Sequence, residues 1–242
     1  MGNSLAIEES AFEGCTSLKS VSFDERDTIT QIGKSAFKNC SELQSFSVPR
    51  ASELTIEDSA FENCSLLQSV ILSGNVTTIG DYAFSGCRAL KIANIPDQVT
   101  RIGEWAYANC MQMDSVRLGS SIQTIGDCGL MINSENIRII DCYLPKPITI
   151  GLQALDYIPS SCLLVVNPGT AELWRNADGW NTMTIIERNN VISPDEEITW
   201  TFKNGLLSIF GSGPMEEFGA SNLIPWGAYS KQIDSVYIQD GI

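Results

Sequence analysis

One short stretch, Ile79–Cys87, reads Ile-Gly-Asp-Tyr-Ala-Phe-Ser-Gly-Cys, and related copies of it recur along the first half of the chain. The aromatic position of the stretch returns every 23 to 25 residues, with leucine in a degenerate sixth copy: Phe12, Phe37, Phe61, Phe84, Tyr107 and Leu130. A fixed period of this length indicates a solenoid, in which each repeat forms one coil that packs on the next. The recurrence therefore constrains the fold more than any other feature of the chain.

Each copy continues with a cysteine and then apolar positions that alternate with other residues. In the fourth copy these positions are Cys87, Leu90, Ala93 and Ile95. Alternation of this kind predicts a short strand with one buried face. Equivalent positions of stacked coils lie about 4.8 Å apart, so identical residues should form columns through the core. We expect short parallel strands and short helical turns with a period of about 23 residues.

Two small residues recur in the motif. The alanine before each aromatic predicts a packing site that is too tight for a larger side chain. Glycine opens the motif in four copies, at Gly33, Gly80, Gly103 and Gly126. Glycine would suit a positive φ at this position. Because Glu8 and Glu57 take the same place in two other copies, that conformation should be optional.

The repeat pattern changes near residue 145. Pro145 and Pro147 remove backbone donors and oppose a regular ladder. The next segment has the irregular form of an end cap, with a helix expected from an N-cap at Thr170 to a stop at Gly179. Leu173 and Trp174 should face inward from this helix. We predict three domains: a solenoid of about six coils at 1–145, a cap with one helix at 146–189, and a small β module at 190–242.

The last segment contains two runs of strand-like residues, 198–202 and 206–210, joined by a turn that contains Asn-Gly. This pair favours a tight hairpin. The aromatic residues of the segment could form a platform on which sugars stack, although core packing is the interpretation we favour. These residues are Trp200, Phe202, Phe210, Phe218, Trp226 and Tyr229.

Eight cysteines raise the question of disulfides or metal binding. Five of them occupy one repeat position, and none forms a C-x-x-C pair: Cys15, Cys40, Cys64, Cys87 and Cys110. Side chains stacked in a column point the same way and are separated by more than the ~3.8 Å between Cβ atoms that a disulfide prefers. We therefore expect buried free thiols, with Cys142 and Cys162 as the one pair for which a bridge is considered.

The charge balance limits the classes of partner. Fifteen basic and 29 acidic residues give a net charge of −14, with no basic run. This field opposes phosphate backbones and anionic membrane surfaces, so we expect no nucleic-acid partner. No apolar stretch approaches the ~20 residues that a membrane span needs, and no signal segment opens the chain. Since the sequence starts inside a repeat, we expect a fragment of a longer protein.

Catalysis has little support in the sequence. The chain has no histidine, which is the commonest general base and metal ligand. Ser35 and Lys38 match an S-x-x-K pattern, but the Ala-Phe between them is the core element of the second coil. Acidic clusters such as Asp195–Glu197 lack the spacing of a calcium loop. We expect no enzyme, and no catalytic, cofactor-binding or metal-binding residues.

The repeat Ile-Gly-x-x-Ala-Phe-x-x-Cys, followed by Leu-x-x-Val-x-Ile-Pro, resembles the BspA-type leucine-rich repeat of bacterial surface proteins. The stretch from Cys142 through Cys162 to Trp180 is similar to the C-terminal cap of such arrays in Bacteroidetes. Residues 198–241 resemble a small β module that introduces a further array. The resemblance covers essentially the whole chain. It implies a leucine-rich-repeat solenoid and a secreted or cell-surface location, with adhesion in several members, but it supplies no binding residues.

The outward positions of the predicted strands form two columns of short, nearly uncharged side chains. We take these positions as the candidate binding face: Ser22, Ser45, Ser47, Ser69, Ile71, Ile92, Asn94, Ser115 and Arg117. A flat surface of this kind lets a large protein partner approach closely, although serine is also tolerated on any solvated strand. The expected function is a non-catalytic binding or adhesion protein. The alternative is a structural spacer that displays other parts of a longer surface protein.

Overall fold

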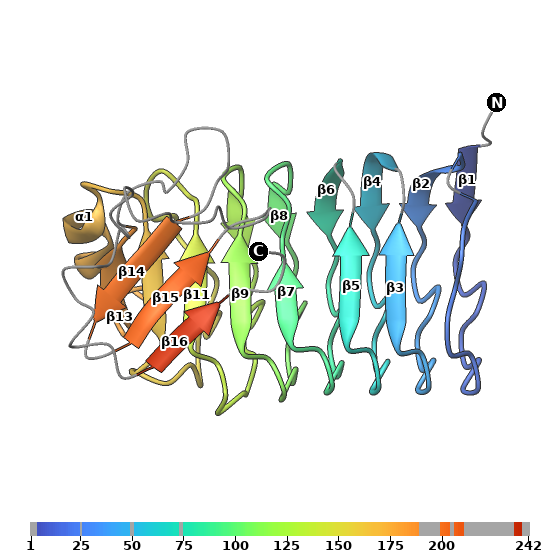
Figure 1. Cartoon of the computed structure of the whole chain (residues 1–242). Coiled ribbons are helices and arrows are strands. Elements are labelled where there is room, and N and C mark those ends of the chain that lie inside the picture. The colour runs from blue at the N-terminus through green and yellow to red at the C-terminus, as the bar shows by residue number, and fades with distance from the viewer. Residues whose placement is uncertain are drawn as a thin grey trace, which may run out of the picture.

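The computed structural model describes residues 4–24, 26–48, 51–72, 75–188, 199–203, 206–210 and 235–238. Within them the chain winds into a solenoid whose coils stack along one axis (Figure 1). The predicted fold class is confirmed. We number the coils 1 to 6 by the residue at the aromatic position: Phe12, Phe37, Phe61, Phe84, Tyr107 and Leu130.

The first sheet has six parallel strands in the order β1-β2-β4-β6-β8-β10. Its strands are β1 (Ser4–Ile7), β2 (Thr28–Ile32), β4 (Ala51–Ile56), β6 (Val76–Ile79), β8 (Arg101–Ile102) and β10 (Thr124–Ile125). Every strand ends on an isoleucine that pairs in register with the isoleucine of the next strand. This column closes one side of the core.

The second layer contains a five-stranded sheet in the order β13-β12-β11-β9-β7 and the pair β3-β5. Its strands are β3 (Ser45–Val48), β5 (Ser69–Leu72), β7 (Ile92–Asn94), β9 (Ser115–Leu118), β11 (Ile139–Cys142), β12 (Leu163–Val166) and β13 (Thr184–Glu187). In β3, Phe46 and Val48 are buried while Ser45 and Ser47 are exposed, as the alternation predicts.

The repeated motif forms hydrogen-bonded turns between the two layers rather than helix. Backbone N–H groups of one coil donate to carbonyl groups of the next; for example, the Phe37 N–H donates to the Ala60 carbonyl at 2.8 Å. The aromatic rings form a continuous stack, with centroids 5.2 Å apart between Phe61 and Phe84. The alanines of coils 2 to 5 are fully buried, which confirms the tight site predicted for them.

The glycines that open the motif act through close approach, and the expected positive φ is wrong. A Cβ atom on Gly80 would lie 2.6 Å from the backbone nitrogen of Asp58, and one on Gly103 would lie 2.5 Å from that of Asp81. A side chain at these two positions would force the neighbouring coil to shift, which favours glycine there. The left-handed conformation occurs instead at two other positions of the motif: two residues after the glycine, as at Ser35 and Tyr82, and just before the cysteine, at Asn39, Asn63 and Gly86.

All eight cysteines are free, and seven of them are buried; Cys15 is exposed on coil 1. The thiols of the stacked cysteines form a further series of hydrogen bonds between coils, in addition to the backbone bonds. The Cys40 thiol donates to the Phe12 carbonyl at 3.1 Å, and the Cys64 thiol repeats this contact one coil later, at 3.1 Å from its acceptor. Cysteine therefore suits this position because it is small and apolar and carries a weak donor.

We expect one fast and seven slow thiols in the native protein. Burial raises the pKa of Cys40 to about 11 and that of Cys64 to about 12, which suppresses the reactive thiolate. Cys15 should react first because it is exposed. The measurement is the time course of a chromogenic thiol reagent at pH 8, with and without guanidinium chloride. Fewer than eight thiols in denaturant without reductant would contradict the free state of all eight cysteines, and fewer than five would contradict the free-thiol ladder itself.

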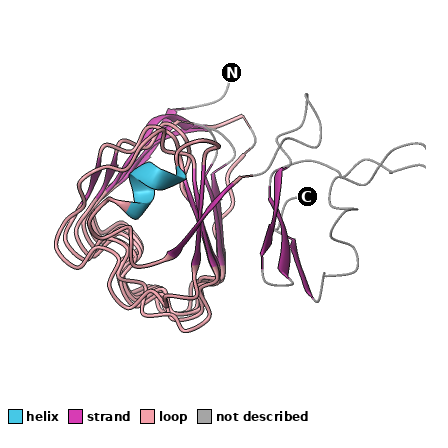
Figure 2. Ribbon diagram, turned by 90° about the vertical axis from the view of Figure 1, so that its left-hand side faces the viewer, coloured by secondary structure: helices cyan, strands magenta, loops and turns pink. Residues whose placement is uncertain are grey.

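A short helix, α1 (Ala171–Arg175), closes the C-terminal end of the core. Seen end-on, it lies across the opening that the coils surround (Figure 2). Trp174 is fully buried there and packs edge-on against Trp180 at 5.0 Å between ring centroids. The Trp180 indole N–H donates to the Ile148 carbonyl at 2.9 Å.

Two expectations about this helix are wrong, and a third is confirmed only in part. Leu173 is 53% exposed, because only positions 171 and 174, three residues apart, share the inward face. Thr170 is the N-cap residue, as predicted, but its side chain makes no capping hydrogen bond; instead, the Glu187 carboxylate accepts the Ala171 N–H at 2.9 Å. The helix also ends at Arg175, before Gly179.

The last part of the chain contributes β14 (Thr199–Lys203), β15 (Leu206–Phe210) and β16 (Ser235–Ile238). The first two strands pair antiparallel, as expected for the hairpin, and β16 pairs parallel with β15. Tyr237 of β16 packs against Ile139, Leu163 and Val165 on the outer side of the solenoid. Phe218, Trp226 and Tyr229 lie outside the described residues, and the three-domain division stays a prediction.

Candidate functional site

Strand register brings the predicted binding residues onto one face of the second layer. Ser45 pairs with Ser69 and Ser47 with Ile71, so these four form two adjacent columns. The columns resume on β7 and β9, where Ile92 pairs with Ser115 and Asn94 pairs with Arg117. The period-two alternation therefore identified a shared face.

The N-terminal part of this face is open to solvent. We call its residues on β3, β5 and β7 the outer strip: Ser45, Ser47, Ser69, Ile71, Ile92 and Asn94. Ile71 is 63% exposed at its centre and Ile92 is half-buried, while the other four are exposed. Ser22 is exposed on coil 1, outside the named strands. The strip carries no charged side chain and consists mostly of short ones.

The face changes at β9. Ser115 is only 6% exposed, so the expectation that both columns stay exposed along the array is wrong there. Arg117 is half-buried and donates to the Asp97 carboxylate at 3.0 Å and to the Ile95 carbonyl at 3.2 Å. Beyond it the same columns hold the buried Asp141 and the buried apolar residues Ile139, Leu163 and Val165, and Tyr237 packs against these three.

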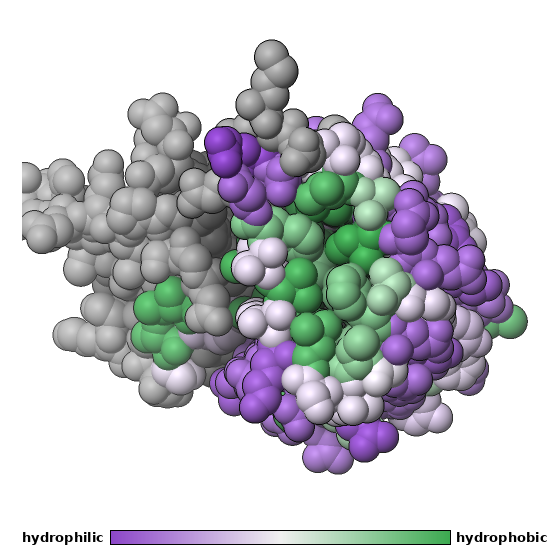
Figure 3. Space-filling view, turned by 90° about the vertical axis from the view of Figure 1, so that its right-hand side faces the viewer, coloured by the Kyte–Doolittle hydropathy of each residue, from purple (hydrophilic) through white to green (hydrophobic). Residues whose placement is uncertain are grey.

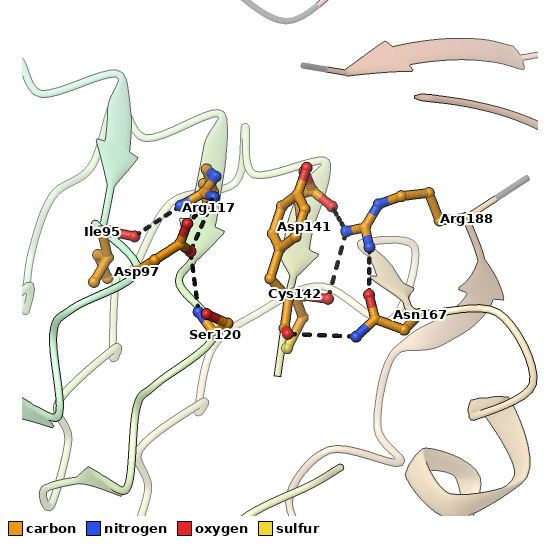
Figure 4. Close-up of polar contacts among 9 residues, drawn as sticks. Ile95, Asp97, Arg117, Ser120, Asp141, Cys142, Asn167 and Arg188 are labelled. Atoms are coloured by element: carbon orange, nitrogen blue, oxygen red, sulfur yellow. Dashed lines mark hydrogen bonds and ion pairs between the residues drawn. The ribbon is translucent and has the colours of Figure 1, made fainter. Parts of the chain in front are cut away.

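A buried polar network occupies this C-terminal part of the face (Figure 4). Arg188 donates to the Asp141 carboxylate and, at 2.7 Å, to the Asn167 side-chain carbonyl. Its guanidinium also lies 3.9 Å from the centroid of the Tyr143 ring, and the Arg117 guanidinium lies 4.4 Å from the same ring. Burial raises the pKa of Tyr143 to about 12, so its hydroxyl stays neutral.

This network was not predicted from the sequence. Asp141 falls in the column of Asn94 and Arg117, and Arg188 follows the outward Ile186 by two residues. The alternation of the strands therefore marks both positions as facing the same side of the sheet. Both side chains are more than nine-tenths buried. The network therefore ties β13 to β11 and offers no accessible group for chemistry.

The other candidate chemical groups are engaged elsewhere. Lys38 of the S-x-x-K pattern forms an ion pair with Glu62 at 2.8 Å, and Ser35 occupies a turn position with a φ of 56°. Among the described residues, no group of three acidic, cysteine or histidine side chains could hold a metal ion. In the same part of the chain, no helix is long and apolar enough to cross a bilayer.

A polar pocket of about 340 Å³ borders the C-terminal end of the strip. Its lining comes from the residues that precede the outer strands and from β16: Lys91, Gln112, Asp114, Asn136, Arg138 and Tyr237. Lys91 and Arg138 are exposed. This pocket is a shallow polar border beside the strip rather than an enclosed site.

Comparison with protein families agrees with this architecture. The model of the BspA type leucine rich repeat region matches residues 3–114 and 77–156, as six copies. No curated protein sequence gives a significant match.

Three solved structures of bacterial leucine-rich-repeat proteins align with this chain. A leucine rich repeat protein from T. pallidum aligns with a TM-score of 0.52 and 25% identity, over 64% of this chain and 72% of its own. A leucine-rich repeat protein from Bacteroides ovatus aligns with a TM-score of 0.47 and 18% identity, over 76% of this chain and 56% of its own. A leucine rich cell surface protein from Faecalibacterium prausnitzii aligns with a TM-score of 0.26 and 17% identity, over 79% of this chain and 80% of its own.

Proposed function

The chain belongs to the BspA-type leucine-rich repeat family, and from that premise we propose that it is a non-catalytic binding protein of the cell surface or the secreted fraction. We further propose that its ligand is a protein and that this ligand docks on the outer strip. The family supports the class of function, since such repeats serve mainly as scaffolds for protein interaction. The site is argued from the residues of the strip.

One observation carries the choice of site: Ile71 is 63% exposed and lies in register with Ser47 on the neighbouring strand. An exposed apolar side chain ringed by short polar ones has the character of an interface centre with a polar rim. The absence of charge within the strip lowers the cost of removing water from it. The strip therefore suits a broad, flat protein surface rather than a small molecule.

A spacer role is the second candidate, and the continuous backbone ladder supports it. Hydrogen bonds connect the turns of each coil to those of the next, so the array is a stiff support. A spacer needs no partner on the strip. Substitutions that change the strip without unfolding the protein therefore separate the two roles.

We expect the combined substitution Ser47→Arg and Asn94→Glu to weaken partner binding at least tenfold. The two residues lie in one column on either side of Ile71, and each change adds bulk and a charge that an interface cannot easily desolvate. Thermal unfolding should be unaffected because both side chains are exposed. The measurement is capture of a partner from native surroundings, followed by titration of that purified partner.

The matched control is Asp24→Asn in the acidic loop, where Asp24 pairs with Arg26 at 3.0 Å in solvent. An exposed pair contributes little, so this variant should bind as the parent does. Parent-like affinity of the double variant would remove the strip as the site. Failure of the parent to capture any protein would favour the spacer.

A further inference from the structure

The two outward columns of the second layer continue past the outer strip. Strand register carries them from β9 onto β11 and β12, where the outward residues are Ile139, Asp141, Leu163 and Val165. We call the three apolar members, Ile139, Leu163 and Val165, the covered patch, because they point out of the solenoid and yet are buried. One continuous face is therefore open to solvent on β3, β5 and β7 and closed on β11 and β12.

The three-stranded sheet β14-β15-β16 covers this patch. It lies over the C-terminal strands of the second layer (Figure 1, Figure 2). Tyr237 of β16 packs against the covered patch, while the other three residues of β16 are exposed. Two of these, Val236 and Ile238, alternate with Tyr237 and so lie on the opposite face of the strand. Hydrophobic residues are visible at the surface here, apart from those at the end of the solenoid (Figure 3). Tyr237 is thus the residue that anchors β16.

The contact leaves polar atoms buried without partners. Ser208 of β15 is in register with Tyr237 and therefore faces the same side of the small sheet. Ser208 is 0% exposed, and among the described residues its hydroxyl has no hydrogen-bond partner. On the solenoid side, the Nε atom of Arg188 is also buried and unpaired within the described part of the chain. Burying an unpaired polar atom is unfavourable, so these atoms oppose the docking of the sheet.

The small sheet is also attached less firmly than the coils are to one another. In the solenoid, β12 pairs in parallel register with both β11 and β13. Among the described strands, by contrast, β14, β15 and β16 pair only with one another. Moving the sheet away would expose the covered patch, which is unfavourable, but it would also hydrate Ser208 and Arg188. The sheet should therefore separate under conditions in which the coils stay folded.

We propose that the sheet β14-β15-β16 is a removable cover over a second half of the partner-binding face. This inference rests on the proposed function, because it assigns the outer strip and the covered patch to the same protein partner. Once the sheet has moved away, that partner extends from the strip across β9 onto the patch. Its surface there carries apolar side chains and a hydrogen-bond acceptor for Arg188, which binds Asp141 beside Val165.

The first test places a thiol under the cover. In the Val165→Cys variant of the full chain, the new thiol lies in the patch that Tyr237 contacts, whereas Cys87 and Cys142 belong to the main core. Alkylation by iodoacetamide at rising guanidinium chloride concentration is resolved by site with mass spectrometry. We expect position 165 to react at a denaturant concentration at which Cys87 and Cys142 stay protected. Exposure of all three thiols at the same concentration would show one cooperative unit and overturn the proposal.

Two substitutions on β16 form a matched pair in this assay. Tyr237→Ser removes the anchor and should raise the alkylation rate at position 165 at least tenfold without denaturant, while Cys87 and Cys142 stay slow and so report a folded solenoid. Val236→Ser changes the neighbouring residue on the exposed face, so it should leave all rates as they are without it. A thiol at position 165 that stays equally slow in Tyr237→Ser would rule out Tyr237 as the anchor and overturn the proposal.

The second test measures affinity, with the purified protein from the capture experiment as the probe. We expect Tyr237→Ser to bind it at least fivefold more tightly than the parent does, because the sheet no longer has to be displaced. Adding Val165→Arg should remove this gain. Capture of no protein by the parent would contradict the proposed function and this inference with it. Binding by the parent without a gain in Tyr237→Ser would overturn this inference alone.

Discussion

Replacing Phe84 by alanine should lower the free energy of unfolding by about 3–5 kcal/mol, the range for removing a large buried aromatic side chain. The ring lies in the middle of the aromatic stack, 5.2 Å from Phe61 and 5.1 Å from Tyr107 between centroids. Neighbours on both sides are fixed by the backbone ladder, so they cannot collapse into the cavity. The loss therefore includes both the transfer of the ring and the empty space that it leaves.

The same substitution at Phe12 is the control and should be clearly less destabilising. Phe12 has a ring partner on one side only and is already 40% exposed. Both values come from denaturant titration, read as a shift in midpoint at unchanged slope. Equal losses at the two positions would contradict a stack whose first coil is uncovered.

The columns of the core were predictable because each is sampled several times in the sequence. An error in aligning one copy hardly affects the predicted column, because the other four copies have alanine, cysteine or an aromatic residue at the equivalent position of the repeat. The glycine column shows the limit of this reasoning. Positive φ and close backbone approach both select glycine, so the residue alone cannot distinguish them; the Cβ distance at Gly80 does.

Single-copy features were harder to predict. Leu173 and Trp174 are adjacent in a helix of five residues, too short for a periodic pattern to fix which one faces the core. For the candidate site, alternation correctly placed Ser115 on the outer face of its strand. Alternation does not predict its burial, because the same sheet face is exposed on β3 and buried from β9 onward; there Tyr237, more than 100 residues away in the chain, packs against Ile139, Leu163 and Val165. Orientation is a local property, whereas exposure is not.

The Arg188→Met variant should lose about 3–5 kcal/mol of stability, the range for removing one member of a buried ion pair. The side chains of Arg188 and Asp141 are 7% and 3% exposed, so the Asp141 carboxylate would stay buried without its partner. Burial already raises the pKa of Asp141, and Arg188 opposes that effect. Without the arginine, the folded-state pKa should therefore rise further above its unfolded value of about 3.9.

This rise fixes the sign of the pH dependence. A carboxyl group with a raised folded pKa favours the folded state when it is protonated, and that contribution is lost as the pH rises through the folded pKa. Arg188→Met should therefore lose stability between pH 4 and pH 7 relative to the parent, as measured by denaturant midpoints across that range. A constant difference would show that Asp141 reaches water in the variant.

The double variant Arg188→Met with Asp141→Leu should recover most of the lost stability, because no charge then remains to be desolvated. The single and double variants together give the coupling energy between Arg188 and Asp141. This energy excludes the packing of the arginine on the Tyr143 ring, because both variants that lack Arg188 lose that packing. If the double variant is as unstable as Arg188→Met alone, the stacking on Tyr143 and the bond to Asn167, rather than the ion pair, join β13 to β11. If it recovers, the pair contributes little net stability, and the arginine is required chiefly because Asp141 is buried beside it.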